Sequence, residues 1–232
     1  MQQEIITLSS PKSRVSEAFR ELRTNLEFSM INKEVRTILI TSAFPNEGKS
    51  WTSSNLAVAF AQHKKKVILV DADMRRGSQA DIFNIQASSG LSNLLSVIDQ
   101  NKDDLDKIDF DEYIKSTELN NLFILPSGIR PINPSELISS DAMTILIEIL
   151  KYNYDYIIFD GTPSILVTDS VILSSILDTT VIVAKYKSTK IDSIKQLKKS
   201  IANVGGKIAG VVLNKIPNKK SDYSSGYYGY YE

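Results

Sequence analysis

Short apolar runs alternate along this chain with longer stretches in which apolar residues recur at helical spacing. The runs are rich in β-branched residues and almost uninterrupted, which is typical of strands buried on both faces of a sheet. They predict strands at Arg36–Ile40, Lys66–Val70, Leu122–Leu125, Tyr156–Phe159, Thr180–Ala184 and Ile208–Leu213. Helices are predicted at Val15–Phe28, Lys49–His63, Leu91–Leu95, Pro134–Tyr152, Asp169–Leu177 and Ile191–Val204. This alternation favours an α/β fold in which crossover helices flank a mostly parallel sheet.

No internal repeat or long linker interrupts the pattern, which predicts one domain over residues 1–216 with a first helix inside 13–29. Between Gln100 and Asn120 the pattern weakens into an acidic stretch with scattered lysines, which we expect to be a surface insertion. The remaining residues, 217–232, differ in composition from everything before them.

Five of the ten tyrosines lie in this last segment, spaced by Ser and Gly: Tyr223, Tyr227, Tyr228, Tyr230 and Tyr231. Gly and Ser give a solvated backbone that cannot recover its ordering entropy by burial, so residues 217–232 are predicted to form a flexible tail. By itself such a segment is typical of a low-complexity terminus or a binding segment. The chemistry of the rest of the chain must decide what it does.

Composition and charge narrow the function classes. The 232 residues carry 27 basic and 27 acidic side chains, so no global field favours nucleic acid or an anionic membrane surface. The chain has no cysteine, which excludes disulfides, thiolate metal ligands and cysteine nucleophiles and suits the cytosol. No stretch approaches about 18 uninterrupted apolar residues, and Lys, Arg and Glu recur through the first thirty residues, so neither a membrane span nor a signal peptide is predicted. We therefore expect a soluble protein whose function depends on local sites.

The strongest chemical signal follows the first predicted strand, where Ser42–Ser50 opens directly onto a helix. In a P-loop, backbone N–H groups cradle phosphates, a Lys reaches the β- and γ-phosphate oxygens, and a Ser hydroxyl ligates Mg²⁺. Gly48, Lys49 and Ser50 fill these positions. The residues expected around the nucleotide are Ala43, Pro45, Asn46, Glu47, Gly48, Lys49, Ser50 and Trp51, the last also packing within the domain.

The loop departs from the usual P-loop pattern at its first position, where Ala43 replaces glycine. This costs only a methyl group if the backbone there has negative φ. Asn46 stands in the middle of the loop, and Asn tolerates left-handed backbone better than other side chains after Gly. A tight phosphate loop therefore remains possible.

Three aspartates follow predicted strands. Asp71 and Asp73 come just after one buried strand, and Asp160 follows another. Ligands of open α/β sheets sit outside the carboxyl ends of the strands, where these carboxylates can hold Mg²⁺, orient a nucleophile or accept its proton. An Asp at a strand end is also a common helix or turn cap, but three beside a P-loop point to a catalytic site.

These motifs resemble those of the bacterial tyrosine kinases that regulate capsule and exopolysaccharide export, in particular their free-standing cytoplasmic half. The resemblance rests on the P-loop, on Asp71-Ala72-Asp73-Met74-Arg75 and on the strand ending in Asp160. It extends to Glu17–Asn25, Pro131–Leu137, Gly210–Asn214 and the tyrosine tail, and so covers nearly the whole chain. Two departures are Asn46, where the family usually has Gly, and Gly161-Thr162-Pro163, where it has Thr-Pro-Pro or Thr-Ala-Pro.

The resemblance implies transfer of phosphate from ATP, with Mg²⁺, to the tail tyrosines. A carboxylate near a phenol can accept its proton during the transfer, and Asp71 is the predicted base. Ser50, Asp71, Asp73 and Asp160 are the predicted metal ligands, with Lys49 neutralising the transferred group; the sequence leaves the roles of the three aspartates open. Asn214 resembles the adenine contact of the family, or is a turn residue.

The first helix resembles the subunit contact of the same family. Val15, Phe19, Leu22 and Leu26 form an apolar stripe flanked by Glu17, Arg20 and Arg23. These three residues are either a solvated face with a Glu17–Arg20 pair or, as the resemblance implies, the contact that closes a ring of eight subunits. The resemblance further implies an activator, the cytoplasmic end of a membrane co-polymerase that recruits the chain to the inner membrane face, and a protein-tyrosine phosphatase.

Two other functions remain compatible with the motifs. One is a P-loop ATPase switch that positions complexes or partitions DNA, although such proteins usually carry Lys at the second loop position, where this chain has Phe44. The other is a nucleotide-binding adaptor without transfer activity. Eukaryotic-type kinase chemistry is disfavoured because no H-R-D or D-F-G motif is present.

Overall fold

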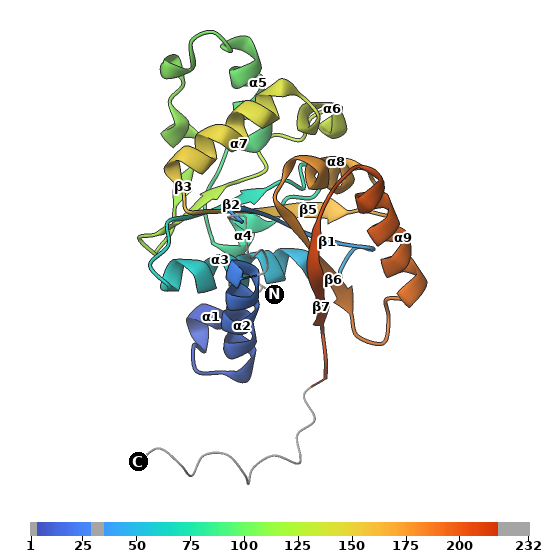
Figure 1. The fold of residues 1–232 in the computed structure, drawn as a ribbon. Helices are drawn as coiled ribbons and strands as arrows, with labels where there is room; N and C mark the ends of the chain where they lie inside the picture. The colour runs from blue at the N-terminus through green and yellow to red at the C-terminus, as the bar shows by residue number, and fades with distance from the viewer. Residues whose placement is uncertain (1–3, 29–34, 218–232) are drawn as a thin grey trace.

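The computed structural model describes residues 4–28 and 35–217 and consists of one twisted sheet between two helical layers (Figure 1). The sheet has seven strands in the order β3-β4-β2-β5-β1-β6-β7. Their bounds are β1 Thr37–Ser42, β2 Val67–Asp71, β3 Lys115–Ser116, β4 Leu122–Leu125, β5 Tyr156–Pro163, β6 Thr179–Lys185 and β7 Ile208–Asn214. All neighbours pair in parallel except β3 and β4. The predicted α/β fold with a mostly parallel sheet is confirmed.

The helices cover both faces of this sheet. They are α1 Ile6–Ser9, α2 Arg14–Phe28, α3 Lys49–Gln62, α4 Gln79–Ile82, α5 Leu91–Gln100, α6 Pro134–Ile138, α7 Asp141–Asn153, α8 Asp169–Ile176 and α9 Ile191–Asn203. Figure 1 shows α1, α2 and α3 below the sheet and α5 and α7 above it. No helix in the described part of the chain is both long and apolar enough to cross a membrane.

Alternate residues of the central strands enter two separate cores. Ile38 and Ile40 of β1 pack with α2 and α3, whereas Leu39 between them packs with α5, α7 and α8. Both sets are fully buried. Burial on both faces is the reason that these strands appear in the sequence as continuous apolar runs.

One predicted helix is wrong: Pro134–Tyr152 forms two helices, α6 and α7, with a break at Ser139 and Ser140. Ser140 has extended backbone, with φ −77° and ψ 159°. The two serine hydroxyls donate to the carbonyls of Glu136 and Leu137. Hydroxyl bonds of this kind compete with the helical ladder, which explains why a stretch with helical periodicity can still turn here.

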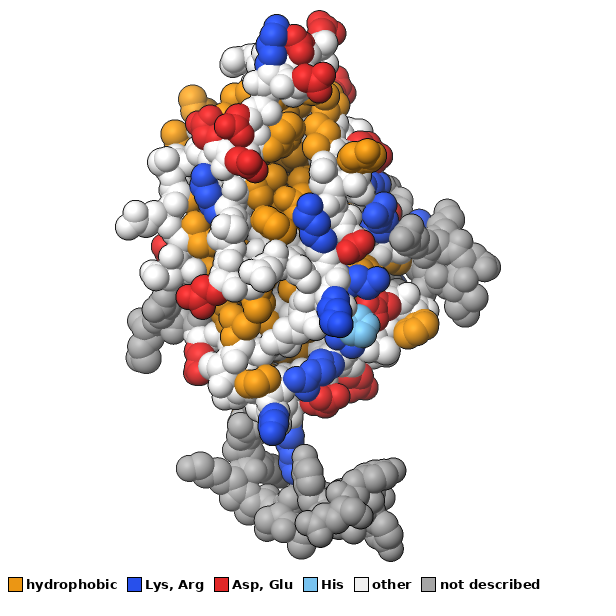
Figure 2. All heavy atoms as spheres, turned by 90° about the vertical axis from the view of Figure 1, so that its left-hand side faces the viewer, with side chains coloured by type: hydrophobic (Ala, Val, Ile, Leu, Met, Phe, Trp, Pro, Cys, Tyr) orange, Lys and Arg blue, Asp and Glu red, His pale blue; other side chains and the backbone are white. Residues whose placement is uncertain are grey.

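The stretch from Gln100 to Asn120 is also more than a surface insertion. The predicted helix beginning at Leu91 continues through Gln100, and the insertion adds two short 3₁₀ turns, η1 Leu105–Lys107 and η2 Phe110–Glu112, and the edge strand β3. Ile108 and Tyr113 join the core on the α5 and α7 face. Figure 2 looks onto the side of the molecule that carries β3, where apolar side chains gather below acidic ones. The charged residues of this stretch concealed its buried apolar ones.

Candidate nucleotide-binding site

The loop between β1 and α3 has the backbone that a P-loop requires. Asn46 and Gly48 have positive φ, 61° and 97°, so the expected left-handed conformation of Asn46 is confirmed. Ala43 is not among the described residues with positive φ, and its methyl group is buried without strain. A Cβ at Gly48 would lie 1.9 Å from Asn214 Nδ2, so glycine is required there by space as well as by conformation.

Side chains hold this loop from behind. The buried Glu47 carboxylate accepts from Phe44 N at 3.0 Å and from the Thr189 hydroxyl. Asn214 Nδ2 donates to the Glu47 carbonyl at 3.0 Å, and Lys215 Nζ donates to the Asn46 carbonyl at 2.8 Å. Glu47 and Asn214, both predicted around the nucleotide, thus support the loop, Glu47 from within it and Asn214 from the end of β7. Thr189 and Lys215 were missed because only the folded chain brings them to the loop.

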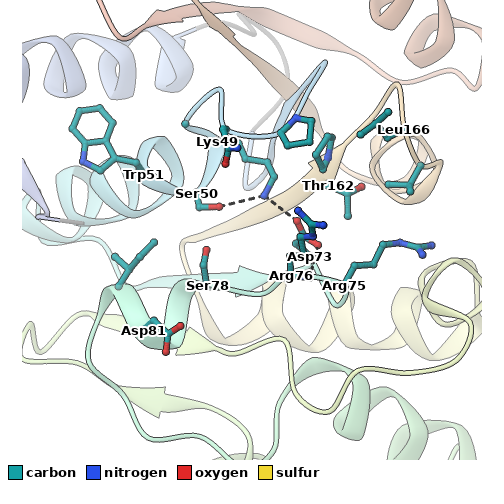
Figure 3. Close-up of a pocket in the computed structure, with 16 residues that line it drawn as sticks. Lys49, Ser50, Trp51, Asp73, Arg75, Arg76, Ser78, Asp81, Thr162 and Leu166 are labelled. Carbon is teal, nitrogen blue, oxygen red and sulfur yellow. Dashed lines mark hydrogen bonds and ion pairs between the residues drawn. The ribbon is translucent and has the colours of Figure 1, made fainter. Parts of the chain in front are cut away.

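Lys49 lies at the centre of the site. Its Nζ is 3.0 Å from Asp73 Oδ2 and donates to Ser50 Oγ at 3.2 Å (Figure 3). The same nitrogen is 3.8 Å from Asp160 Oδ1. Burial lowers the pKa of this ammonium, but the attraction of Asp160 and Asp73 outweighs it, so the pKa is raised. Lys49 therefore stays charged inside the site.

Asp71 is fully buried at the end of β2. Its Oδ2 accepts from the backbone N–H groups of Ser78 at 2.7 Å and Gln79 at 2.9 Å. Burial, and next the negative charge of Asp160, raise the pKa of this carboxyl to about 7. A group with this pKa changes protonation near neutral pH, which suits a general base.

Asp160 is held by residues of both α3 and α4. Its Oδ2 accepts from Gln79 Nε2 at 2.8 Å, and its Oδ1 accepts from Ser53 Oγ at 3.3 Å. Sequence reasoning missed Gln79, whose only sequence signal is its position shortly after the Asp71–Arg75 motif. All three predicted aspartates come together beside Lys49, as expected. Asp160 does not follow a strand as predicted, however, because β5 continues past Phe159 to Pro163.

The loop that carries Asp73 is anchored on its far side by Arg75. Its guanidinium donates to Asp169 through Nε at 2.8 Å and through a terminal nitrogen at 3.1 Å, and Ser135 Oγ donates to the same carboxylate at 2.7 Å. Asp169 is buried, so this bidentate pair is a fixed anchor. It joins the loop to α8 and to the start of α6.

Gly161 has a structural explanation. A Cβ on this residue would lie 2.3 Å from Ser170 Oγ and 2.8 Å from Leu39 Cδ1. Ser170 Oγ in turn accepts from Thr162 N at 2.6 Å. The departure at position 161 is therefore matched by a serine hydroxyl that fills the space beside it.

A cleft of about 540 Å³ lies over these residues. Figure 3 shows Lys49, Ser50 and Asp73 near its centre, Trp51 at one end and Leu166 at the other. Of the three aspartates only Asp73 lines the cleft. Trp51 also packs edge-on against Phe19 of α2, with ring centroids 5.3 Å apart, which confirms its predicted packing role.

The donor set of the site suits magnesium bound together with phosphate. No cluster of three or more His, Cys, Asp or Glu side chains within residues 4–28 and 35–217 could hold a metal by itself. Mg²⁺ is usually bound through one or two carboxylates plus substrate phosphates and waters. Ser50 and Asp73 offer oxygen ligands at the cleft, with the Asp160 carboxylate behind them. These residues fit a metal that enters with its nucleotide.

The residues predicted at a subunit contact have partners within the chain. Arg20 pairs with Glu17 at 2.5 Å, which confirms the expected pair, and also donates to the Pro11 carbonyl. Arg23 donates to the Ala59 carbonyl of α3 at 3.2 Å. Phe19 and Leu26 of the apolar stripe are buried, whereas Val15 is 37% exposed. The tail tyrosines, Tyr223 to Tyr231, lie outside the described residues.

The loop, the charged lysine and the strand-end carboxylates define a nucleotide-binding protein of the P-loop class. Residues 35–212 match the family model described as AAA domain. The chain is 37% identical to the tyrosine-protein kinase YwqD of Bacillus subtilis over 230 residues, covering 99% of this chain and 92% of that protein. It therefore belongs to the bacterial tyrosine kinases, and it is a protein-tyrosine kinase.

Solved structures agree with this assignment. The chimerical protein CapA2B2 superimposes with a TM-score of 0.83 at 39% identity, covering 94% of this chain and 92% of that one. The kinase domain of the Escherichia coli tyrosine kinase ETK gives a TM-score of 0.85 at 30% identity, covering 98% and 86%. The MinD protein of Pyrococcus horikoshii, in complex with Mg-ADP, shares the fold with a TM-score of 0.60 at 20% identity over 77% of this chain and 70% of that one.

Proposed function

We propose that this kinase transfers the γ-phosphoryl group of ATP to its C-terminal tyrosines, Tyr223, Tyr227, Tyr228, Tyr230 and Tyr231, in trans between subunits. The observation that carries the proposal is the Lys49 ammonium, held between Asp73 and Asp160 and beside Ser50 under an open cleft. This arrangement places one fixed positive charge and several oxygen ligands where phosphates of a bound nucleotide would lie.

The reaction forms a bond between the tyrosine oxygen and the γ-phosphorus and breaks the bond from that phosphorus to the bridging oxygen of ADP. Lys49 neutralises negative charge on the phosphoryl oxygens, and the N–H groups at the start of α3 bind the phosphates. With Asp71 as the base, Ser50, Asp73 and Asp160 would hold Mg²⁺, directly or through water. When bound, the ion supplies further positive charge at the β- and γ-phosphates.

A carboxylate takes the phenol proton, and we propose Asp71 for this role because its pKa of about 7 suits a base at neutral pH. Asp73 is the alternative because it alone of the three lines the cleft, whereas Asp71 is 1% exposed. An Asp71→Asn and an Asp73→Asn variant separate the two. The base variant should keep nucleotide affinity and lose transfer, while loss of a metal ligand should weaken binding of Mg-nucleotide.

We also propose the cellular role that the family resemblance implies. In this role the kinase works in the cytoplasm as a ring of eight subunits and is recruited to the inner membrane face by the cytoplasmic end of a membrane co-polymerase. Phosphorylation of the tail, reversed by a protein-tyrosine phosphatase, then regulates capsular or exopolysaccharide synthesis and export. Support comes from the motifs of the first helix, the tail and the P-loop together.

The test is the intact mass of the protein after incubation with Mg-ATP, with and without an activator segment. We expect gains of phosphate mass confined to residues 223–231. The Lys49→Met variant should show a transfer rate lower by roughly 10²–10³-fold, the usual cost of removing a group that stabilises transition-state charge. Release of ADP with unchanged protein mass, even with activator, would instead support the ATPase switch suggested by the fold shared with MinD.

A further inference from the structure

A buried amide joins the P-loop helix to the acidic groups of the site. Gln79 is the first residue of the short helix α4, directly after the loop that carries Asp73, and its side chain is fully buried. Nothing in the proposed chemistry uses it. A fully buried amide must have its polar atoms satisfied, so its partners indicate what it holds in place.

Each polar group of Gln79 has a partner. Nε2 donates to Asp160 Oδ2 at 2.8 Å and to the Ser50 carbonyl at 3.1 Å. Oε1 accepts from Ser54 Oγ at 2.7 Å, and the backbone N–H donates to Asp71 Oδ2 at 2.9 Å. One residue therefore contacts both buried carboxylates and the first turns of α3.

The partners determine the orientation of the amide. Asp160 and the Ser50 carbonyl offer only acceptors, so the NH₂ group must face them. The reversed amide would place Oε1 against two acceptor oxygens and leave buried groups unpaired. Gln79 is thus fixed with its donors on Asp160 and on the residue that follows Lys49.

We infer that Gln79 is a positioning residue for phosphoryl transfer. It holds the Asp160 carboxylate on the side of Lys49, whose Nζ lies 3.8 Å from the other oxygen of the same carboxylate. It also ties the end of the Asp73 loop to α3, opposite the anchor that Arg75 makes with Asp169. The acidic groups and the P-loop consequently move as one unit when Mg-nucleotide binds.

Asn55 supplies a matched control for this inference. It is a fully buried amide on α3, but its partners are Thr7 and the Trp51 carbonyl, none of which is a carboxylate of the site. Gln79→Met keeps an unbranched side chain of similar size and removes the amide. Asn55→Leu removes a comparable buried amide from α3, the helix that Gln79 contacts.

Two measurements test the inference. The first is the kinetics of phosphoryl transfer, which gives kcat and the KM for ATP separately. The second is the affinity for a fluorescent ADP analogue with and without Mg²⁺. For Gln79→Met we expect kcat to fall about 10–100-fold, as for residues that orient metal ligands, with KM changing much less. Mg²⁺ should strengthen ADP binding about tenfold less than in the unchanged protein, while Mg²⁺-free affinity stays the same. Asn55→Leu should lose thermal stability but keep both the rate and the effect of Mg²⁺.

If Gln79→Met unfolds, Gln79→Glu takes its place in the test, because a glutamate keeps the shape of glutamine and sets a carboxylate against Asp160. In the Gln79→Glu variant, the strengthening of ADP binding by Mg²⁺ should be reduced at least as much as expected for Gln79→Met. The inference is overturned if Gln79→Met retains the rate within about threefold, or if it loses Mg²⁺-free and Mg²⁺-dependent affinity equally. It is also overturned if Asn55→Leu shows the same losses, since that result assigns Gln79 a general packing role.

Discussion

Asp71, the last residue of β2, lies directly opposite Asp160, which stands inside the adjacent parallel strand β5. Both are buried, and the negative charge of Asp160 raises the cost of ionising Asp71. Lys49 and the N–H groups of the loop after β2 offset part of this cost. The site is therefore a compact cluster of charge in which each residue depends on the others.

The raised pKa of Asp71 makes the free energy of unfolding depend on pH. The folded pKa of Asp71 is about 7 against an ordinary value of 3.8, so between these pH values the folded protein holds a proton that the unfolded chain has lost. Unfolding then releases a proton, and this group makes the protein less stable as pH rises, by at most about 1.4 kcal/mol per pH unit. The midpoint of unfolding in urea should be measured without Mg²⁺ from pH 4 to 8. We expect this midpoint to change less with pH in Asp71→Asn than in the unchanged protein. Parallel profiles for the two proteins would contradict the assignment.

Asp178 stabilises the start of β1. Asp178 Oδ2 accepts from Thr37 N at 2.8 Å and Arg36 N at 3.0 Å, and Asp178 N donates to Thr37 Oγ1 at 2.8 Å. Burial raises the pKa of Asp178, but these N–H donors outweigh it and lower the pKa below its usual value. Asp178→Ala should therefore reduce the free energy of unfolding by about 1–3 kcal/mol.

Chemical denaturation at pH 7 measures this effect, with Asp192→Ala as the control because the Asp192 side chain is 94% exposed. The stabilisation from Asp178 is complete above pH 4 and is lost as pH falls through its lowered pKa. If the two variants are equally stable at neutral pH, the proposed clamp does not contribute.

The space beside Gly161 allows a paired test. Gly161→Ala sets a methyl group 2.3 Å from Ser170 Oγ, and we expect it to destabilise the protein by about 1–3 kcal/mol through overpacking. Ser170→Ala removes the clashing oxygen, so the double variant should recover part of the loss beyond simple addition. Additive effects in a thermal-unfolding cycle would show that the two positions do not compete for space.

The proposed ring can be tested on α2. Changing Glu17, Arg20 and Arg23 together to Ala should lower the light-scattering mass to that of a single chain if these residues form the subunit contact. A Lys195→Ala variant, which alters an exposed ion pair on α9, should leave the mass unchanged. An unaltered mass for the triple variant would exclude this contact.

Phosphorylation should have the same effect as that triple variant. Each phosphotyrosine adds roughly −1.5 to −2 charges, so five on one tail give about −8 to −10. Such a tail would be repelled by the carboxylates of a neighbouring site. We expect the mass to fall after incubation with Mg-ATP, and an equal mass before and after would argue against regulation by dissociation.

Local sequence carries much of this architecture. The central strands could be predicted because both of their faces are buried, and the P-loop because Gly48, Lys49 and Ser50 must be adjacent to do their work. Asp71 and Asp160 could be expected to meet because parallel strands end at one edge of a sheet. The break at Ser139 and Ser140 could not, since hydroxyl bonding competes with the helix only in its folded surroundings.

By itself, then, the sequence determined the alternation of strands and helices, the phosphate loop and the presence of acidic groups beside it, all of which depend on neighbours along the chain. Tertiary structure alone decided that Glu47 and Asn214 brace the loop, that Gly161 must lack a side chain, and that Gln79 binds Asp160. These are contacts between distant segments, and their energy depends on distances and burial that exist only when the sheet is assembled.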